Sequence, residues 1–154
     1  MASEIERAFL VERLPRDLAL GPGQRLRQGY LAEEAGVQVR IRLTGTAATL
    51  TVKSGGGLVR TEVELAVGTD DAEALWELTV GRRIDKVRHR LEVAGGTAEV
   101  DVYAGELDGL VRVEVEFASQ EAAEAFAPPD WFGREVTDDR RWSNASLARH
   151  GRPT

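Results

Sequence analysis

Charged residues recur two positions apart along this 154-residue chain, in pairs of one sign. The pairs are Glu4 and Glu6, Arg40 and Arg42, Glu62 and Glu64, Lys86 and Arg88, Glu99 and Asp101, and Glu114 and Glu116. On a β-strand, side chains two positions apart point to the same face. Carboxylate oxygens bind hard divalent cations such as Mg²⁺ and Mn²⁺, whereas arginine and lysine bind phosphate oxygens. If these faces share one interior, the pattern predicts a site for a metal-bound polyphosphate.

The alternative for each pair is the solvent-exposed face of an antiparallel sheet. That arrangement is the common one for a single half-buried strand. A solvated surface, however, normally mixes its positive and negative charges. The separation of signs between strands therefore favours a common charged interior.

The strands that must position these pairs are indicated by alternation of apolar and polar residues. Residues 37–43 and 110–117 alternate without a break, and glycine-rich turns such as 54–57 and 95–96 separate similar segments. About eight such strands fit a closed barrel. We therefore expect a mainly β (α+β) fold, a closed eight-stranded antiparallel β-barrel or tunnel with a charged interior and a few helices packed outside.

Helical spacing and capping residues predict helices over 69–78, 119–126 and 138–148. The second helix has a serine cap and ends before two prolines, and Thr137 and Asp138 are the expected cap of the third. Helices outside the barrel would cover the apolar strand faces. The last helix could close a tunnel mouth.

Composition limits the number of domains, the cellular location and the classes of partner that can be expected. A mass of 16.8 kDa with 42% hydrophobic residues fits a single domain, expected over 1–150 with a frayed tail at 151–154. The absence of cysteine excludes disulfides and thiolate sites, so we expect a cytoplasmic protein. No apolar run predicts a membrane span, and a net charge of -6 argues against nucleic acid as a partner. A monomer or a homodimer is equally compatible with the sequence.

Short motifs in a fixed order resemble those of the CYTH superfamily, the triphosphate tunnel metalloenzymes. Glu4-Ile5-Glu6 resembles the opening ExExK motif, and further matches include Val39-Arg40-Ile41-Arg42, Arg60-Thr61-Glu62-Val63-Glu64 and Glu114-Val115-Glu116-Phe117. The set most resembles short bacterial members that hydrolyse inorganic triphosphate. The resemblance implies a β-tunnel in which basic side chains bind triphosphate and acids bind one or two divalent metals, Mg²⁺ or Mn²⁺.

The resemblance also implies a role for each charged pair. The metal-ligand candidates are Glu4, Glu6, Glu62, Glu64, Glu114 and Glu116, with Glu99 and Asp101 as further ligands or orienting groups. The substrate-binding candidates are Arg40, Arg42, Lys53, Arg60, Lys86 and Arg88. The short bacterial members suggest a catalytic pair, here Tyr30 and Lys86. The expected reaction is metal-dependent hydrolysis of triphosphate to pyrophosphate and phosphate.

One position departs from the family pattern, because Ala8 replaces the lysine of ExExK. Loss of one charge-assisted contact costs about 1.5 to 3 kcal/mol. An engineered change, a natural variant with altered substrate use and a degenerate binding protein would each explain it. We expect impaired activity, and Ala8→Lys would raise kcat/KM by about tenfold or more. The alternatives to an inorganic triphosphatase are a hydrolase or cyclase acting on an organic triphosphate, such as ATP or thiamine triphosphate, and a non-catalytic polyphosphate-binding module.

Overall fold

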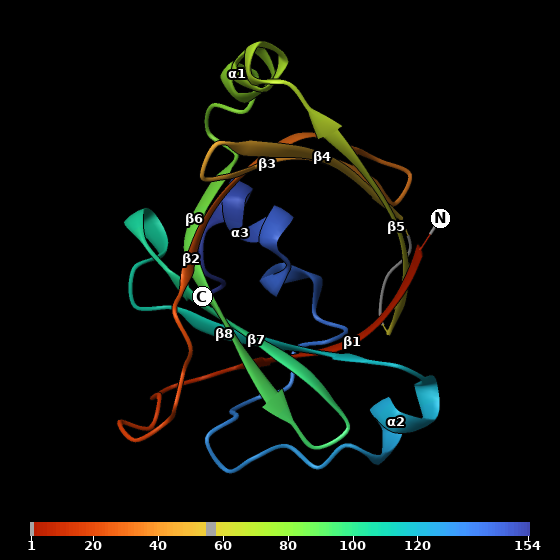
Figure 1. Cartoon of the computed structure of the whole chain (residues 1–154), viewed down its shortest axis with the longest axis vertical. Helices are drawn as coiled ribbons and strands as arrows, with labels where there is room; N and C mark the ends of the chain where they lie inside the picture. The colour runs from red at the N-terminus through yellow and green to blue at the C-terminus, as the bar shows by residue number, and fades with distance from the viewer. Residues whose placement is uncertain (1, 55–57) are drawn as a thin grey trace.

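The structure, a computed structural model, describes residues 2–54 and 58–154, so most of the turn expected at 54–57 lies outside the described residues. Antiparallel strands form a closed ring in the order β1-β5-β4-β3-β2-β6-β7-β8 (Figure 1). The strands are β1 (Ala2–Leu10), β2 (Gln24–Glu34), β3 (Val37–Thr44), β4 (Ala47–Ser54), β5 (Val59–Val67), β6 (Arg83–Val93), β7 (Gly96–Tyr103) and β8 (Val111–Phe117). The expected eight-stranded antiparallel fold is confirmed.

The hydrophobic core on one side of the ring lies outside the barrel wall. Val113 and Val115 of β8 are fully buried there beneath helix α2 (Gln120–Ala125). Phe9 of β1 belongs to the same cluster, and its ring centroid lies 5.0 Å from that of Phe132. Ser119 caps α2 as expected, since its hydroxyl accepts a hydrogen bond from the Ala122 amide at 3.0 Å. On this side the strands turn their apolar faces outward, as predicted.

The helical cover is nevertheless incomplete, contrary to expectation. Helix α1 (Thr69–Glu77) lies beside β3 and β4, and α2 lies beside β1 and β8. Neither short helix covers the outer face of β5, where Val59, Val63 and Leu65 are 47%, 40% and 55% exposed.

Among the described residues, no helix is both long and apolar enough to cross a membrane.

The C-terminal residues cross one end of the barrel instead of covering its outside (Figure 1). The helix expected over 138–148 is divided into the 3₁₀ helix η2 (Arg140–Trp142) and helix α3 (Asn144–His150). Asp139 and Ser143 are their caps, so the expected capping by Thr137 and Asp138 is wrong. A further 3₁₀ helix, η1 (Gly105–Leu107), was not expected.

A second apolar cluster joins α3 to the strands at this end of the barrel. It contains residues from five strand ends or adjoining turns and from the C-terminal segment, namely Ala8, Tyr30, Ile84, Tyr103, Leu107, Leu110, Val136, Trp142, Ala145 and Leu147. All of them are nearly inaccessible to solvent. The interior is therefore apolar at the end under α3 and charged beyond it.

Residues 133–137 extend the barrel wall beside β1. The first half of β1 pairs with β5 and the second half with β8, which leaves one edge of the second half open. Val136 donates its amide hydrogen to the Ala8 carbonyl at 2.8 Å, and Gly133 donates to Leu10 at 2.7 Å. A Cβ at Gly133 would lie 2.7 Å from the Leu10 carbonyl oxygen, so this approach requires glycine. The segment fills the open edge and leads into η2 and α3.

Candidate active site in the barrel interior

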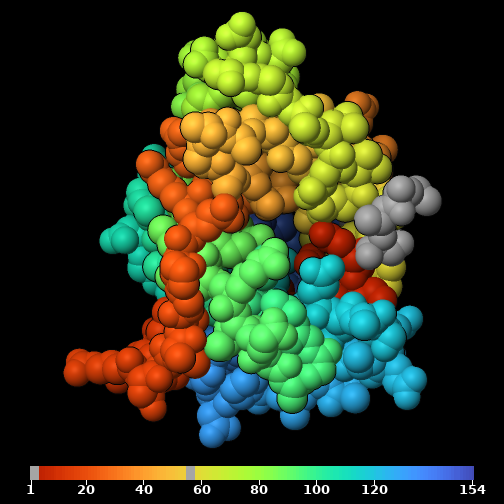
Figure 2. All heavy atoms as spheres, viewed as in Figure 1, coloured from red at the N-terminus to blue at the C-terminus, as the bar shows by residue number. Residues whose placement is uncertain are grey.

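A central cavity of about 230 Å³ lies inside the barrel. All six expected metal ligands line it, together with Glu99, Tyr30 and the expected cations Arg40, Arg42, Lys53, Arg60 and Arg88. The space-filling view shows atoms of the C-terminal part at the base of the central hollow (Figure 2). At least one member of each charged pair in the sequence therefore faces one interior space.

Two further cavities adjoin the central one at opposite ends of the barrel. One shares Lys53 and Arg60 with it, on the side of α3. The other shares Arg42 and Glu64 with it and extends to Thr44, at the far end of β3. The charged interior thus has a route toward both ends, as in a tunnel.

Strand register places opposite charges next to each other on the interior face. Glu4 pairs in register with Arg60, and Lys53 pairs with Glu62. The Lys53 ammonium lies 3.3 Å from a Glu4 oxygen and 3.1 Å from a Glu62 oxygen. Arg60 reaches Glu6 at 3.5 Å. Cross-strand ion pairs of this kind compensate much of the buried charge.

Arg40 and Arg42 differ from these cations, because among the described residues neither forms an ion pair with a carboxylate. Arg40 is 4% exposed, and its Nε has no hydrogen-bond partner. Arg42 donates two hydrogen bonds to the neutral Gln28 side chain, at 3.0 and 2.7 Å. Burial, with Arg40 and Arg88 nearby, lowers the pKa of Arg42 to about 10. A buried and a half-buried guanidinium group, neither of them ion-paired with a carboxylate among the described residues, form a site that favours an anion.

The carboxylates form two close pairs, Glu4 with Glu62 and Glu6 with Glu114. Burial raises the pKa of Glu4 to about 7 and that of Glu6 to about 8. Burial also acts on their partners, but hydrogen bonds from Glu64 and Glu4 and the charge of Lys53 lower the pKa of Glu62 to about 2. Arg112 and a hydrogen bond from Glu6 likewise hold the pKa of Glu114 well below its usual range, against burial. Near neutral pH each pair therefore shares one proton.

These pairs supply the donor atoms that a hard divalent cation requires. Glu4 Oε2 and Glu62 Oε2 both face the Lys53 ammonium, at 3.3 and 3.1 Å, and carboxylate oxygens are the usual ligands of Mg²⁺ and Mn²⁺. Within residues 2–54 and 58–154, no group of three or more acidic or histidine side chains converges into a ligand set. The chemistry of the donors fits a metal, and the assignment of these glutamates as ligands stays a prediction.

Similar proteins are known by sequence and by structure. An inorganic triphosphatase of Nitrosomonas europaea is 46% identical over 149 residues, which cover 95% of this chain and 97% of that protein. An inorganic triphosphatase of Acetivibrio thermocellus is 36% identical over 97% of this chain and 96% of its own length. The chain belongs to the CYTH superfamily.

Structural comparison agrees with this assignment, although no family model matches the chain. A crystal structure of an inorganic triphosphatase superposes with a TM-score of 0.73 at 42% identity, covering 99% of both chains. A putative adenylate cyclase of Bacillus halodurans shares the fold, with a TM-score of 0.58, 22% identity and coverage of 80% of this chain and 86% of that chain. The same fold thus occurs in proteins described as a triphosphatase and as a putative cyclase.

Two residues that the CYTH resemblance assigned to the site lie below the cavity wall. Lys86 and Asp101 are fully buried, with the ammonium 2.7 Å from a carboxylate oxygen, and neither lines the cavity. Both oxygens of Asp101 also accept hydrogen bonds from Arg88, at 2.7 and 2.9 Å. Burial lowers the pKa of Lys86 to about 7, although Asp101 opposes this shift. Direct contact of Lys86 with substrate or of Asp101 with a metal has no support from this geometry. The alternative role predicted for Asp101, as an orienting group, is compatible with its bonds to Lys86 and Arg88 and stays a prediction.

Tyr30, the expected catalytic partner of Lys86, does line the cavity. Its hydroxyl accepts a hydrogen bond from Gln28 at 3.1 Å. The Lys86 ammonium instead faces the ring of Tyr103, 5.6 Å from its centroid. The structure brings Tyr30, but not Lys86, to the site, so direct proton transfer by this pair has no support from the geometry.

Ala8, at the position of the CYTH lysine, does not line the cavity either. It shares the inward face of β1 with Glu6 but is 5% exposed within the apolar cluster under α3. Trp142 and Leu147 belong to the same cluster. The C-terminal residues therefore pack where a longer side chain at this position would extend.

Several cavity-lining residues were not among the expected site residues, including Arg112, Arg90, Gln38, Ser143 and Asn144. Arg112 and Arg90 share the strand face of charged residues already assigned, so the same alternation could have identified them. Arg112 forms an ion pair with Glu114. The neutral residues carried no such signal. Asn144 lies in α3 and accepts a hydrogen bond from the Tyr103 hydroxyl at 2.5 Å, a contact that depends on the position of α3 across the barrel end.

Proposed function

We propose that this chain hydrolyses inorganic triphosphate to pyrophosphate and orthophosphate in the barrel interior, with Mg²⁺ or Mn²⁺ as cofactor. The observation that carries the proposal is the pair of guanidinium groups of Arg40 and Arg42, which line the same cavity as the two carboxylate pairs and form no ion pair among the described residues. A metal-bound polyphosphate needs both kinds of group at once. The names of the two related inorganic triphosphatases support the same reaction.

The cations of the cavity would bind and orient the substrate. Arg40 and Arg42 have no carboxylate to release, so phosphate oxygens would be their first counter-charges. Lys53 and Arg60 are already paired with glutamates and would share their charge between carboxylate and phosphate. Fixed cations in a buried cavity stabilise developing charge more strongly than the same cations in water.

The carboxylate pairs would hold the divalent cation, with Glu4, Glu6, Glu62 and Glu114 as its ligands. When bound, such a cation neutralises phosphate charge and lowers the pKa of a coordinated water. The protons that these pairs share would leave as the metal binds. Glu64, Glu99 and Glu116 line the same cavity and would complete or orient the ligand set.

The lining of the cavity favours an inorganic substrate over an organic triphosphate. Its walls consist of charged and polar side chains, and Tyr30 is the one aromatic residue among the lining residues that the structure describes. A nucleoside or thiamine group normally requires apolar or aromatic surface for stacking. We therefore place ATP and thiamine triphosphate second as substrates.

The test measures phosphate release from triphosphate, ATP and thiamine triphosphate with Mg²⁺, Mn²⁺ or EDTA. We expect turnover of triphosphate that requires the metal, and loss of that turnover in Glu114→Gln. Glu124→Gln, an exposed change on α2, is the matched control and should retain full activity. Equal activity in the two variants would remove Glu114 from the site. Binding of triphosphate without any turnover would instead support a polyphosphate-binding module.

A further inference from the structure

A second and larger cavity, of about 480 Å³, lies outside the central one at the barrel end that carries α3. We call it the vestibule and define its cationic wall as Lys53, Arg60, Arg112, Arg140 and Arg149. The first three also line the central cavity, so the vestibule adjoins it directly. The other two come from η2 and α3, segments that no charged strand pair pointed to. Arg141 lines the vestibule as well but is bonded to Asp139.

The vestibule has more cations than carboxylates. Glu33, Asp138 and Asp139 are its acidic lining residues. Asp139 is already engaged, because both of its oxygens accept hydrogen bonds from the Arg141 guanidinium, at 2.9 and 2.7 Å. Lys53, Arg60 and Arg112 are also ion-paired, with glutamates of the central cavity. Arg140 and Arg149 are thus the lining cations that form no ion pair among the described residues, and such cations attract anions to that opening.

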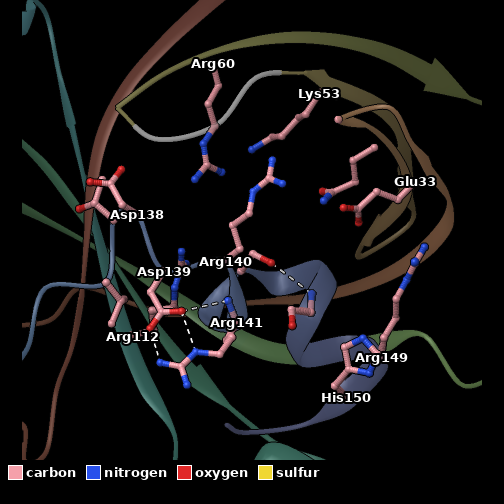
Figure 3. Close-up of a pocket in the computed structure, with 16 residues that line it drawn as sticks. Glu33, Lys53, Arg60, Arg112, Asp138, Asp139, Arg140, Arg141, Arg149 and His150 are labelled. Carbon is pink, nitrogen blue, oxygen red and sulfur yellow. Dashed lines mark hydrogen bonds and ion pairs between the residues drawn. The ribbon is translucent and has the colours of Figure 1, made fainter.

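Arg140 is the vestibule cation whose placement is most informative. Figure 3 shows its side chain extending toward Lys53 and Arg60, whereas Arg141 turns away toward Asp139. Among the described residues, no carboxylate lies within ion-pair distance of Arg140. The Arg140 guanidinium thus faces Lys53 and Arg60 across the vestibule. Because glutamates of the central cavity compensate Lys53 and Arg60, Arg140 is the one of these three cations whose charge is left to attract an anion.

We propose that the vestibule is a second anion-binding site, in which Arg140 captures a condensed inorganic phosphate before it passes Lys53 and Arg60 into the central cavity. The identity of this anion rests on the proposed function. Because the reacting groups line the central cavity, capture at Arg140 contributes to association and not to the chemical step. Arg140 should therefore raise kcat/KM and leave kcat unchanged. This contribution should weaken as the salt concentration rises, because salt screens the attraction between Arg140 and the anion.

The experiment compares Arg140→Gln with Arg141→Gln, which removes a neighbouring arginine that is tied to Asp139. For triphosphate at low ionic strength we expect Arg140→Gln to lower kcat/KM about tenfold, as loss of one charge-assisted contact implies, with kcat within about twofold. The dependence of kcat/KM on NaCl should become shallower. Arg140→Lys should restore most of the loss. Equal kcat/KM values and equal salt dependence in Arg140→Gln and Arg141→Gln would overturn the proposal.

A binding experiment tests the vestibule independently of the proposed function. Calorimetric titration with triphosphate and with pyrophosphate, in EDTA and without turnover, should give weaker binding in Arg140→Gln than in Arg141→Gln. A loss confined to triphosphate assigns the site to the substrate, and an equal loss for pyrophosphate assigns it to the product as well. If the wild-type chain does not hydrolyse triphosphate, the proposed function is wrong. This titration would still show whether the vestibule binds an anion through Arg140. Unchanged affinity for both anions in Arg140→Gln would overturn it.

Discussion

Two buried carboxylate pairs, Glu4 with Glu62 and Glu6 with Glu114, bring like charges together in the barrel interior. Such pairs are stable when they share a proton or when a cation lies between them. The raised pKa values of Glu4 and Glu6, about 7 and about 8, mean that the proton is present at and below neutral pH. Protons and divalent cations therefore compete for the same oxygens.

We expect Mn²⁺ binding to release protons and to strengthen as the pH rises through these two values. Below them the shared proton must leave before the metal binds, and above them it is already absent. Calorimetry in two buffers of different ionisation enthalpy measures the number of protons released. Glu4→Gln should release fewer protons than the wild type. An affinity that does not change across this pH range would contradict the assignment of the pairs as ligands.

The face of each charged residue was predictable from sequence, but its depth along the barrel was not. A period of two assigns side chains to the interior face, and the cavity lining agrees for all the glutamate pairs. The same period placed Lys86 and Asp101 on that face without indicating that they lie below the cavity wall. Their burial depends on contacts with each other and with Arg88 and Tyr103 across neighbouring strands, which no local pattern encodes.

At the level of elements, α3 determines the environment of Ala8. The alternation of β1 predicted an inward side chain, and the CYTH resemblance predicted the loss of a substrate contact. The structure instead packs Ala8 against an apolar layer that includes Trp142 and Leu147. The effect of this residue on activity stays a prediction, and its effect on packing can be tested directly.

We expect Ala8→Lys to lower the thermal unfolding temperature, because the larger side chain overpacks a buried apolar site and its charge loses solvation there. Overpacking alone typically costs about 1 to 3 kcal/mol. Thermal denaturation measures the effect, and Ala104→Lys, a change at an exposed alanine, is the control. An unchanged unfolding temperature together with a tenfold rise in kcat/KM would show that α3 leaves this position and that the sequence-based expectation was correct.

The segment at 133–137 is fixed to β1 by an ion pair as well as by backbone bonds. Arg7 donates two hydrogen bonds to the carboxylate of Glu135, at 2.9 and 2.6 Å. The hydrogen bond from Arg7 lowers the pKa of Glu135. A lowered folded-state pKa stabilises the fold above the ordinary glutamate pKa, and this contribution disappears as the pH falls through the lowered value.

Glu135→Gln should therefore reduce the free energy of unfolding at neutral pH by about 0.2 to 1 kcal/mol, the range for a partly exposed ion pair. Denaturant titrations of both proteins at several pH values measure the difference. It should shrink in acid, where the wild-type carboxylate is also protonated. A difference that is constant with pH would mean that the ion pair contributes nothing.

Element boundaries were predicted well where the helical period was clear, as in α1, and where a cap agreed with it, as Ser119 does in α2. The third helix was less predictable, because 138–148 contains helix-forming residues but Asp139 and Ser143 each provide a local cap that interrupts it. That interruption turns the chain across the barrel end. Sequence periodicity does not describe such a turn.

For the whole molecule, apolar side chains contribute stability at the barrel end and outside the wall, and not in the charged centre. Leu147 of α3 is 2% exposed, whereas Leu65 on the outer face of β5 is 55% exposed. Leu147→Ala should cost about 2 to 5 kcal/mol of unfolding free energy. Leu65→Ala should stay within about 0.5 kcal/mol. Equal losses in chemical denaturation would show that β5 is covered in solution.

The closed strand ring could be predicted because each strand repeats its own alternation, and the glycine turns separate one strand from the next. The exposure of the outer face of β5 could not be predicted. The sequence shows apolar residues there, but it does not show that α1 and α2 are too short to cover them. The vestibule was also not foreseen. It arises where η2 and α3 meet β4 and β5, segments far apart in the chain.

β1 is synthesised before the other strands described, yet its second half is bonded to β8 and to residues 133–137. The chain through residue 137 must therefore have left the ribosome before these bonds can form. Until then β1 has an unpaired edge, which is the kind of surface on which nascent chains associate wrongly. Slow closure through such distant contacts is expected of this topology, and a nascent chain arrested before residue 133 should remain open to proteases along β1.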